Sequence, residues 1–394
     1  MNICFVSGEY PPMQGGVGDC THELGRALSQ LGHRVVVVTS SKARRVLPAE
    51  GAAAGEPEAR PIVDHWNWAS WGQVINTAQE AAADVLHIQY QTAAYGMHPA
   101  INLLPLRLRL VSPRPRVLVT FHDLRVPYLF PKAGPVREWA NRTLARWSDA
   151  AIATNVEDYE QLKASGLLQE PHLIPIGSNI HPRAPQGYDR QQWRHGLGVA
   201  DGETLLCYFG FLNASKGGET LFHALSELLG RGLPAKLLMI GGQVGDSDPT
   251  NRAYLERVKA LGEALGVTER VLWTGYMPPE QVSASFWAAD VCLLPYRDGV
   301  SYRRGTLMAA LAHGLPIVST EPRVPMEALV HGQNIFLVPA DDPCATAGAV
   351  ETLASESELR KRLAWGALEL SQRFTWEHIA AQTAQLYEQL GGVE

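Results

Sequence analysis

The chain has 394 residues, of which 46% are hydrophobic and 19% are charged, and its formal net charge is −6. Single hydrophobic cores stop growing at about 250 to 300 residues, so two domains are expected, each with a full core. The ordinary composition is typical of a globular protein, and the mild negative charge argues against a nucleic-acid partner.

The N-terminus and the cysteines predict a cytoplasmic protein. "MNICFVSGEYPP" leads from a strand directly into a glycine turn, without the basic region or cleavage site of a signal peptide. No apolar run approaches the roughly 18 residues that a spanning helix needs. The five cysteines lack paired spacing, which suits a reducing compartment.

Strand-like and helix-like runs alternate along the chain, which predicts parallel sheets covered by helices on both faces. Strands are expected in the first half at 2–7, 34–39, 85–90, 116–121, 151–154 and 173–176, with a mobile Ala/Gly/Glu-rich loop near 48–60. In the second half they are expected at 204–210, 236–242, 270–275, 291–295, 316–320 and 335–339. Helices of the second half are expected at about 189–196, 217–231, 250–265, 279–289 and 303–313, and a final helix starts near Trp376 with Thr375 as its N-cap.

The boundary between the two domains is predicted within 177–195, where proline, glycine and polar residues interrupt the periodicity. This assigns residues 1–182 to the first doubly wound domain and 183–375 to the second. Ligands of such sheets bind outside the carboxyl ends of the strands, so we expect the site in a central cleft that both domains face.

A glycine-rich loop, "GEYPPMQGGVGD", follows the first predicted strand. Gly15, Gly16 and Gly18 allow close backbone approach, and the loop precedes a helix whose amides attract anions. The loop therefore predicts contact with a phosphate or a sugar, although the same glycines also suit a tight turn.

Other polar residues of the first half follow the third and fourth predicted strands. His122 and Asp123, in "TFHDL", stand where a strand ends, and a histidine there can bind a ligand hydroxyl or serve as a buried structural residue. His87 lies inside an apolar strand, which favours a structural role. On the acceptor side we place Gln91, Tyr95, His98 and Asp123.

In the second half, cationic residues precede two predicted helices. Lys216 stands before two glycines that open a helix, a position that is unfavourable for a lysine unless an anion lies between. Arg303 and Arg304 stand at the start of another helix and predict a bound phosphate, or otherwise a solvated helix end. Because adjacent residues diverge by about 100°, we expect Arg304 to point inward and Arg303 to solvent.

Positive charge is concentrated between residues 102 and 146, where nine cations stand against Asp123 and Glu138, giving +7. Leucines and a tryptophan are interleaved with these cations. The segment predicts peripheral contact with an anionic membrane, which would lie at the cytoplasmic face, or alternatively an ordinary solvated face.

Taken together, the motifs resemble a retaining glycosyltransferase of family 4. The resemblance rests on "GGVGD", "TFHDL", "YFGFLNASKGGETL", "LLMIGG", "VLWTGYMPPEQVSASFWAADVCLLP", "ALAHGLPIVST" and the closing "RFTWEHIAAQTAQLYEQL". It implies a GT-B fold of two Rossmann-like domains, of which the N-terminal domain binds the acceptor and the C-terminal domain binds the nucleotide sugar. It also implies that residues 376–394 cross back onto the first domain and that no metal ion or other cofactor is required.

The resemblance assigns roles by position. Gly16 would approach the donor phosphates, His122 the transferred sugar and Lys216 the diphosphate. Gly275, Tyr276 and Met277 would meet the base. The other residues expected to bind the donor are Gly15, Asp298, Arg303, Gly305 and Thr306. The residues expected to be catalytic are His122, Lys216 and Arg304.

The sequence departs from the family pattern at three positions. The usual pair of glutamates reads Ser301 and Ala309, and the usual phosphate arginine is Phe211. Asp298 with Gly299 would replace the first glutamate, whereas Arg303 and Arg304 would replace the lost positive charge.

The leading hypothesis is transfer of a hexosyl group from a nucleoside-diphosphate sugar to a hydroxyl of a glycan, a lipid-linked acceptor or a small molecule. The alternatives are a sugar-nucleotide epimerase or hydrolase on the same fold, and a non-catalytic nucleotide-sugar-binding protein.

Overall fold

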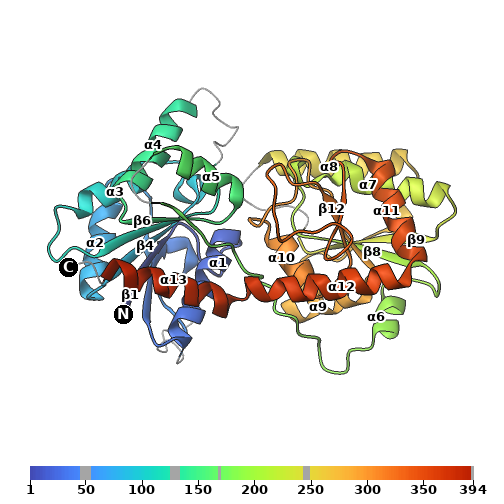
Figure 1. Ribbon diagram of the computed structural model, residues 1–394, viewed down its shortest axis with the longest axis horizontal. Coiled ribbons are helices and arrows are strands. Elements are labelled where there is room, and N and C mark those ends of the chain that lie inside the picture. The colour runs from blue at the N-terminus through green and yellow to red at the C-terminus, as the bar shows by residue number, and fades with distance from the viewer. Residues whose placement is uncertain (45–54, 125–133, 167–169, 243–248, 392–394) are drawn as a thin grey trace. The chain divides into compact units, whose positions relative to one another are not determined.

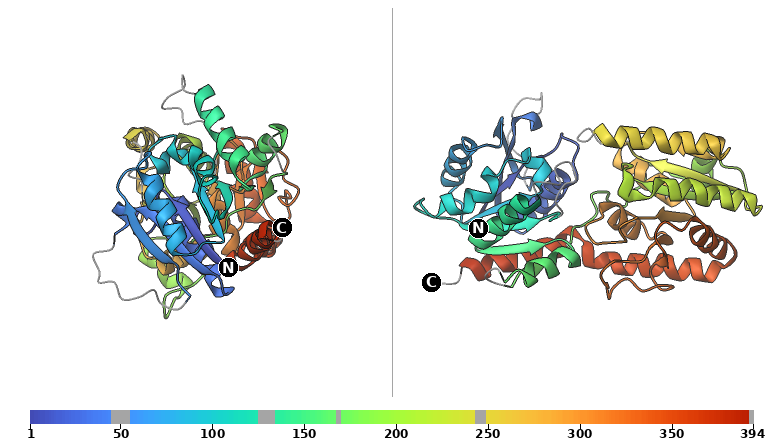
Figure 2. Two further views of the ribbon diagram at one scale, coloured as in Figure 1. Left: turned by 90° about the vertical axis from the view of Figure 1, so that its left-hand side faces the viewer. Right: turned by 90° about the horizontal axis from the view of Figure 1, so that it is seen from above.

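A computed structural model describes residues 1–44, 55–124, 134–166, 170–242 and 249–391 (Figures 1 and 2). It divides into two compact units: unit 1 comprises Met1–Gly177 and Thr375–Glu394, and unit 2 comprises Ser178–Phe374. The chain leaves unit 1 after Gly177, slightly before the position expected from the sequence, and returns to it at Thr375.

The sheet of unit 1 is parallel, with the order β3-β2-β1-β4-β5-β6-β7. Its strands are β1 Asn2–Ser7, β2 Arg34–Ser40, β3 Glu58–Val63, β4 Val85–Tyr90, β5 Arg116–Phe121, β6 Ala150–Ala153 and β7 His172–Leu173. β1 pairs with both β2 and β4, and its residues Ile3 to Val6 are fully buried. Burial on both faces explains why the central strands are continuous apolar runs.

Strand β3 corrects the prediction of a mobile loop over 48–60. Residues 58–63 form an edge strand beside β2, although only Val63 at its end is buried. An edge strand with one buried residue lacks the apolar pattern of the central strands, so its sequence resembles a loop. The rest of the predicted loop, up to residue 54, lies outside the described residues.

The helices of unit 1 are α1 Gly16–Gln30, α2 Ser70–Glu80, α3 Ala100–Leu108, α4 Gly134–Trp147, α5 Val156–Ala164 and α13 Trp376–Gly391, with short 3₁₀ turns at Ser41–Ala43 and Thr92–Tyr95. α1 and α13 pack together on one face of the sheet, whereas α2, α3 and α4 lie side by side on the other (Figure 1). The predicted cap of α13 is confirmed, because Thr375 Oγ1 accepts a hydrogen bond of 3.3 Å from the His378 amide.

The sheet of unit 2 is also parallel, with the order β10-β9-β8-β11-β12-β13. Its strands are β8 Thr204–Phe209, β9 Ala235–Ile240, β10 Val271–Trp273, β11 Val291–Leu294, β12 Ile317–Thr320 and β13 Phe336–Val338. Its helices are α6 Arg190–Gly196, α7 Gly218–Gly230, α8 Pro249–Ala264, α9 Pro279–Ala288, α10 Gly305–Ala312, α11 Pro343–Ser355 and α12 Ser357–Ser371, with 3₁₀ turns at Ala214–Lys216, Thr268–Arg270 and Gln372–Phe374. α7 packs against α8 and α11, and α10 packs against α12 (Figure 1).

In each sheet the winding direction reverses once, between β1 and β4 in unit 1 and between β8 and β11 in unit 2. Ligands of open parallel sheets bind at the carboxyl ends of the strands where this reversal occurs. The loops after these four strands are therefore the places to look for a site. Among the described helices, none is both long and apolar enough to cross a bilayer.

Candidate functional site

The loop after β8 ends at Lys216 and is held against the loop after β11. Asn213 Oδ1 accepts a hydrogen bond of 3.1 Å from the Ser215 amide and so caps the 3₁₀ turn that ends at Lys216. Gly217 follows with φ of 69°, and a Cβ there would lie 1.9 Å from the Pro295 carbonyl oxygen. Only glycine fits this conformation and this space, so Gly217 allows Lys216 to lie beside the β11 loop.

The two arginines at the start of α10 bind one buried carboxylate. Arg303 Nη2 lies 2.9 Å from Asp298 Oδ2, and Arg304 Nη2 binds Asp298 Oδ1. The side chains of Arg303, Arg304 and Asp298 are only 7%, 11% and 8% exposed, respectively. The expectation that one arginine points inward and the other to solvent is therefore wrong. A buried carboxylate requires cationic partners, and the tight loop between β11 and α10 turns both arginines towards it.

Two of the cationic groups lie over the aromatic ring of Tyr296. The Arg304 guanidinium carbon lies 4.8 Å from the ring centroid and Lys216 Nζ lies 5.2 Å from it. Aromatic faces attract cations at these distances. The Tyr296 hydroxyl is hydrogen-bonded to Thr306 Oγ1 in the first turn of α10, which fixes the ring. Lys216, Arg303, Arg304, Tyr296 and Asp298 thus form one group, called here the cationic cluster.

The cationic cluster has more positive than negative charge. Within these five residues, three cationic side chains stand against the one carboxylate of Asp298, and Lys216 makes no ion pair with any residue that the structure describes. Desolvation, together with the Arg304 and Arg303 guanidiniums, lowers the pKa of Lys216 well below its ordinary value. An anion in this position would relieve the repulsion between the cations and favour a protonated Lys216.

Two further features of the cationic cluster suit an anion. Arg304 Nε is a buried donor with no hydrogen-bond partner in the described part of the chain. α7 and α10 both begin at this edge of the sheet, and the N-cap residue of neither helix supplies a side-chain cap. The first amide of α7, that of Gly218, donates a hydrogen bond of 2.9 Å to the Tyr254 hydroxyl. Charge-assisted hydrogen bonds and helix amides are the usual means of binding phosphate. The arrangement can therefore bind a diphosphate.

The remaining donor-side residues of unit 2 surround the same edge. Gly305 has open space around its Cα, whereas Thr306 is engaged with Tyr296. Gly275, which has φ of 66°, follows β10 and pairs with Gly241 after β9. Tyr276 is 80% exposed, and Met277 Sδ accepts a hydrogen bond from Ser285.

The three positions expected to depart from the family pattern have distinct environments. Phe211 is 38% exposed and packs on Gly242, where a Cβ would lie only 2.7 Å from its ring. Ala309 is fully buried in α10, so it presents no polar group to a ligand. Ser301 accepts a hydrogen bond from the Arg304 amide through its carbonyl oxygen. Asp298, which was expected to stand in for a glutamate, binds Arg303 and Arg304.

In unit 1 the carboxylate of Glu9, which the sequence did not predict as a site residue, binds amides of the glycine loop. Glu9 Oε1 accepts hydrogen bonds of 3.0 Å from the Val17 amide and 3.3 Å from the Gly18 amide, at the start of α1. A Cβ on Gly15 would lie 2.1 Å from this carboxylate. Burial raises the pKa of Glu9. The Glu9 carboxylate therefore binds two of the amides that were expected to meet a phosphate. Of the three glycines of this loop, Gly16 alone is exposed.

His122, at the end of β5, is oriented by a chain of buried polar groups. Its Nε2 lies 2.8 Å from Gln89 Oε1, an oxygen that can only accept, so the proton is on Nε2 and Nδ1 has a lone pair. Gln89 Nε2 lies 3.2 Å from His87 Nε2, and His87 Nδ1 lies 2.7 Å from the Tyr387 hydroxyl of α13. Burial lowers the pKa of His122 to about 4 and that of His87 to about 3.

His122 is consequently neutral at neutral pH and can accept a hydrogen bond at Nδ1. The structural role predicted for His87 is confirmed, since it is fully buried and bonded on both nitrogens. Gln89 and Tyr387 were not identified from the sequence. The alternation "LHIQY" places His87 and Gln89 on the same face of β4, and this pattern could have revealed the pair.

The predicted acceptor-side residues differ in accessibility. Tyr95 is buried, and its hydroxyl lies 2.8 Å from the Val6 carbonyl oxygen and 3.0 Å from that of Gln89. Its expected role in facing a ligand is therefore wrong, because an aromatic ring with a hydrogen-bonded hydroxyl is more stable in the core. Gln91, His98 and Asp123 are partly exposed at the carboxyl edge.

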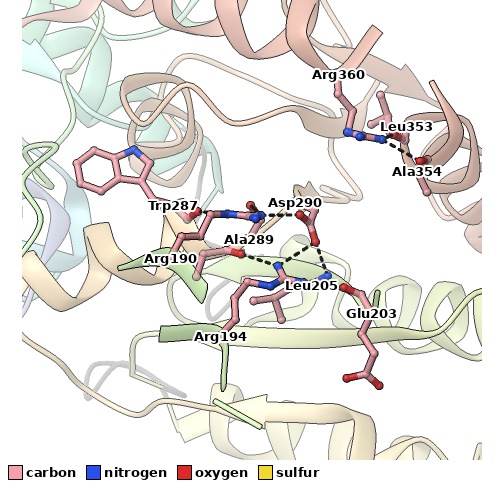
Figure 3. A network of polar contacts seen from close by, with 11 residues as sticks. Arg190, Arg194, Glu203, Leu205, Trp287, Ala289, Asp290, Leu353, Ala354 and Arg360 are labelled. Carbon is pink, nitrogen blue, oxygen red and sulfur yellow. Dashed lines mark hydrogen bonds and ion pairs between the residues drawn. The ribbon is translucent and has the colours of Figure 1, made fainter. Parts of the chain in front are cut away.

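A cavity of about 550 Å³ lies at the opposite, amino-terminal edge of the unit 2 sheet. Its polar groups bind one another (Figure 3): Asp290 accepts from Arg190 at 2.6 Å, from Arg194 at 3.0 Å and from the Leu205 amide at 2.8 Å. These bonds fix α6 to the starts of β8 and β11. The cavity is therefore structural and lies far from the edge where ligands bind.

Two doubly wound parallel sheets in tandem are the architecture of the GT-B class of fold. The cationic cluster lies at the reversal point of the second sheet. Residues 203–356 match the model of "Glycosyl transferases group 1", and residues 15–177 match that of "Glycosyl transferase 4-like domain". The chain belongs to the family 4 glycosyltransferases.

Two of the named relatives of the chain are 32% and 25% identical to it. D-inositol 3-phosphate glycosyltransferase of Corynebacterium efficiens is 32% identical over 222 residues, which are 55% of this chain and 50% of that protein. Phosphatidyl-myo-inositol mannosyltransferase of Mycobacterium leprae is 25% identical over 397 residues, covering 98% of this chain and 95% of that protein. The chain spans about half the length of the curated inositol 3-phosphate glycosyltransferases that it matches.

Solved structures share the fold over the whole chain. Sucrose-phosphate synthase from Thermosynechococcus elongatus has a TM-score of 0.77 with 22% identity, covering 98% of both chains. Anabaena HepE in complex with UDP and glucose has a TM-score of 0.76 with 19% identity, covering 100% of both chains.

Proposed function

We propose that the protein is a retaining glycosyltransferase that moves a hexosyl group from a nucleoside-diphosphate sugar to an acceptor hydroxyl, without a metal ion or other cofactor. The observation that carries this proposal is the cationic cluster at the reversal point of the unit 2 sheet. Three cationic side chains and the N-terminus of α10, which no N-cap side chain covers, would supply the charge stabilisation that a departing diphosphate needs.

In the proposed reaction the bond between the anomeric carbon and the diphosphate oxygen breaks, and a bond forms between that carbon and the acceptor oxygen. The acceptor proton passes to the departing diphosphate. Lys216 and Arg304 would bind the diphosphate, whereas His122 would accept a hydrogen bond from a sugar hydroxyl at Nδ1. The neutral His122 suits this role because a lone pair is required there.

UDP is the first nucleotide to test, because the structure of Anabaena HepE holds UDP. The relatives named for inositol phosphate and phosphatidyl-inositol support an acceptor that is a polyhydroxylated ring, free or linked to a lipid. Gly275, Tyr276 and Met277 are the proposed contacts of the base.

The test is binding and turnover of the full chain in the presence of EDTA. We expect UDP to stabilise the protein by about 2.7 kcal/mol at a hundred times its dissociation constant, measured as a thermal shift beside GDP, ADP and dTDP. Release of free sugar or an epimer from UDP-glucose without an acceptor would favour an epimerase or hydrolase. If no nucleoside diphosphate stabilises the protein and no sugar is transferred, the glycosyltransferase proposal fails.

Diphosphate binding is expected to take up a proton near Lys216. The pKa of the free lysine is lowered by desolvation and by Arg304, and a bound dianion would raise it again. Between these two pKa values the complex holds one proton more than the free protein, so affinity falls as pH rises, by up to about tenfold per pH unit.

Calorimetry of UDP binding in buffers of different ionisation enthalpy would measure this uptake. Lys216→Met should abolish it, whereas Lys259→Met should not, because Lys259 lies on α8 with its ammonium over the Trp273 ring. Identical proton uptake in the Lys216 variant would assign the linkage to another group.

We also propose peripheral contact with an anionic membrane through residues 102–146. Two of the predicted cations are neutralised, since Arg114 pairs with Asp149 at 2.8 Å and Arg142 with Glu138 at 2.5 Å. Arg125, Lys132 and the side chain of Arg137 lie outside the described residues. Leu110 at 81% exposure and Trp139 at 56% remain as apolar contacts. Arg109 and Arg146 lie over the Trp147 ring, at 4.7 and 6.0 Å from its centroid.

Binding to phosphatidylglycerol vesicles should therefore be weakened by salt and by Leu110→Asp. Each cation near an anionic surface contributes about 1 kcal/mol, and this contribution is screened over a Debye length of about 8 Å. Leu31→Asp is the control, because Leu31 is a 51% exposed leucine at the end of α1. Equal binding to phosphatidylcholine and phosphatidylglycerol vesicles in a co-sedimentation assay would exclude this contact.

A further inference from the structure

An aromatic cluster lies at the carboxyl edge of unit 1 and includes two of the residues predicted for the acceptor side. It combines Trp66, Trp68 and Trp71, which follow β3, with Tyr95 and His98, which follow β4. Trp66 packs edge-on against Tyr95 at 4.8 Å between ring centroids. The Tyr95 hydroxyl in turn reaches the carbonyl oxygens of Val6 and Gln89, at the ends of β1 and β4. The cluster therefore stands at the reversal point of this sheet.

Trp68 is the exposed member of the aromatic cluster and is held in place by two neighbours. Its ring is perpendicular to Trp71, with centroids 5.1 Å apart at 79°, and to His98, at 5.2 Å and 76°. Trp71 is fixed by a hydrogen bond of 2.9 Å from Nε1 to the Ala100 carbonyl oxygen. Even so, 47% of Trp68 remains accessible. An indole that is immobilised and yet half exposed presents a rigid apolar face.

Polar groups border this face. His98 Nδ1 accepts a hydrogen bond of 3.1 Å from the Ala100 amide, so the neutral ring carries its proton on Nε2 as a donor. Met97, just before it, has φ of 60°, an uncommon conformation for a residue with a side chain. A hydrogen-bond donor beside an indole suits a site that binds hydroxyl groups.

We infer that Trp68 and His98 bind the acceptor, and that this acceptor presents a polyhydroxylated six-membered ring, either a pyranose or a cyclitol. The C–H bonds on one face of such a ring carry slight positive charge and would contact the electron-rich indole face, while a ring hydroxyl would accept a hydrogen bond from His98 Nε2. Gln89 links this site to the transfer machinery, because its carbonyl oxygen contacts Tyr95 and its side chain contacts His122.

The inference rests on the proposed function, since a ring bound here would be the acceptor of the transfer. A membrane surface is the competing occupant for an exposed tryptophan. The polar border of Trp68 favours a hydroxylated ring.

Saturation-transfer NMR of the full chain with methyl β-glucopyranoside, methyl α-mannopyranoside and myo-inositol tests the inference. We expect ring C–H signals from at least one probe, reduced about fivefold or more in Trp68→Ala and largely retained in Trp68→Phe, because phenylalanine preserves an aromatic face. The glycosides and the inositol distinguish a pyranose from a cyclitol. Trp365→Ala is the matched control, since Trp365 is a 71% exposed tryptophan on α12 of unit 2.

Two readouts separate this inference from the proposed function. The UDP thermal shift should be unchanged in Trp68→Ala, because the nucleotide site is assigned to unit 2. If UDP gives no thermal shift in the wild type, that result would contradict the transferase proposal alone. Unchanged sugar signals in Trp68→Ala, or no signal from any probe in the wild type, would overturn the inference. A blue-shifted emission with phosphatidylglycerol vesicles that is lost in Trp68→Ala would overturn it in favour of a membrane contact.

Discussion

Replacing Asp298 with alanine is expected to destabilise unit 2 by about 3–5 kcal/mol, the usual effect of removing one partner from a buried ion pair. The two guanidiniums that it binds are almost inaccessible to water, and Lys216 adds further positive charge beside them. Without the carboxylate, three cationic groups repel one another in a poorly solvated site. At about 2–4 °C per kcal/mol for a unit of this size, the unfolding transition should fall by roughly 6–20 °C.

Differential scanning calorimetry would measure this effect. Asp341→Ala is the control, because Asp341 binds Arg297 at 2.8 Å in an ion pair whose members are half exposed, and such pairs contribute about 0–1 kcal/mol. Inorganic pyrophosphate should stabilise Asp298→Ala more than wild type, since the added anion replaces the lost carboxylate. A variant that unfolds at the wild-type temperature and does not respond to pyrophosphate would contradict this account.

Arg304→Ala is expected to weaken binding of a nucleoside diphosphate by ten- to over a hundredfold, because charge-assisted hydrogen bonds of about 1.5–3 kcal/mol are lost. Arg303→Ala should have a similar effect. The sequence alone indicated that only one of the pair would matter, but the structure directs both side chains to the same carboxylate. Binding of free uridine should change little in either variant.

Isothermal titration with UDP and with uridine would separate the two contributions. Arg304→Lys keeps the charge but loses the planar fork, so an intermediate affinity is expected. Arg297→Ala, in the same loop but paired with Asp341, should bind UDP as the wild type does. If both arginine variants keep UDP affinity within a factor of two, the pair is a structural ion pair, and the diphosphate must be bound by Lys216 and the helix amides.

Much of the fold could be predicted from the sequence because its signals are local. Buried parallel strands are continuous apolar runs, as in "RVVVVT", and helix ends carry their own caps, as Thr375 does for α13. Strand β3 was missed because an edge strand buries little and so carries no such run. Lys216 could be found in the same way, since a lysine at a helix start indicates a nearby anion.

The sequence by itself therefore determined the alternation of strands and helices, the two-domain organisation and the family to which the chain belongs. Only the tertiary structure decided which charges meet: Glu9 binds the amides of the glycine loop, Asp298 binds both arginines, and His87 binds Tyr387 from a helix three hundred positions later in the chain. It also decided that Tyr95 is buried while Trp68 is exposed. The physical reason is that helix and strand formation depends on near neighbours, whereas the pairing of a buried polar group depends on whichever segment the fold brings beside it.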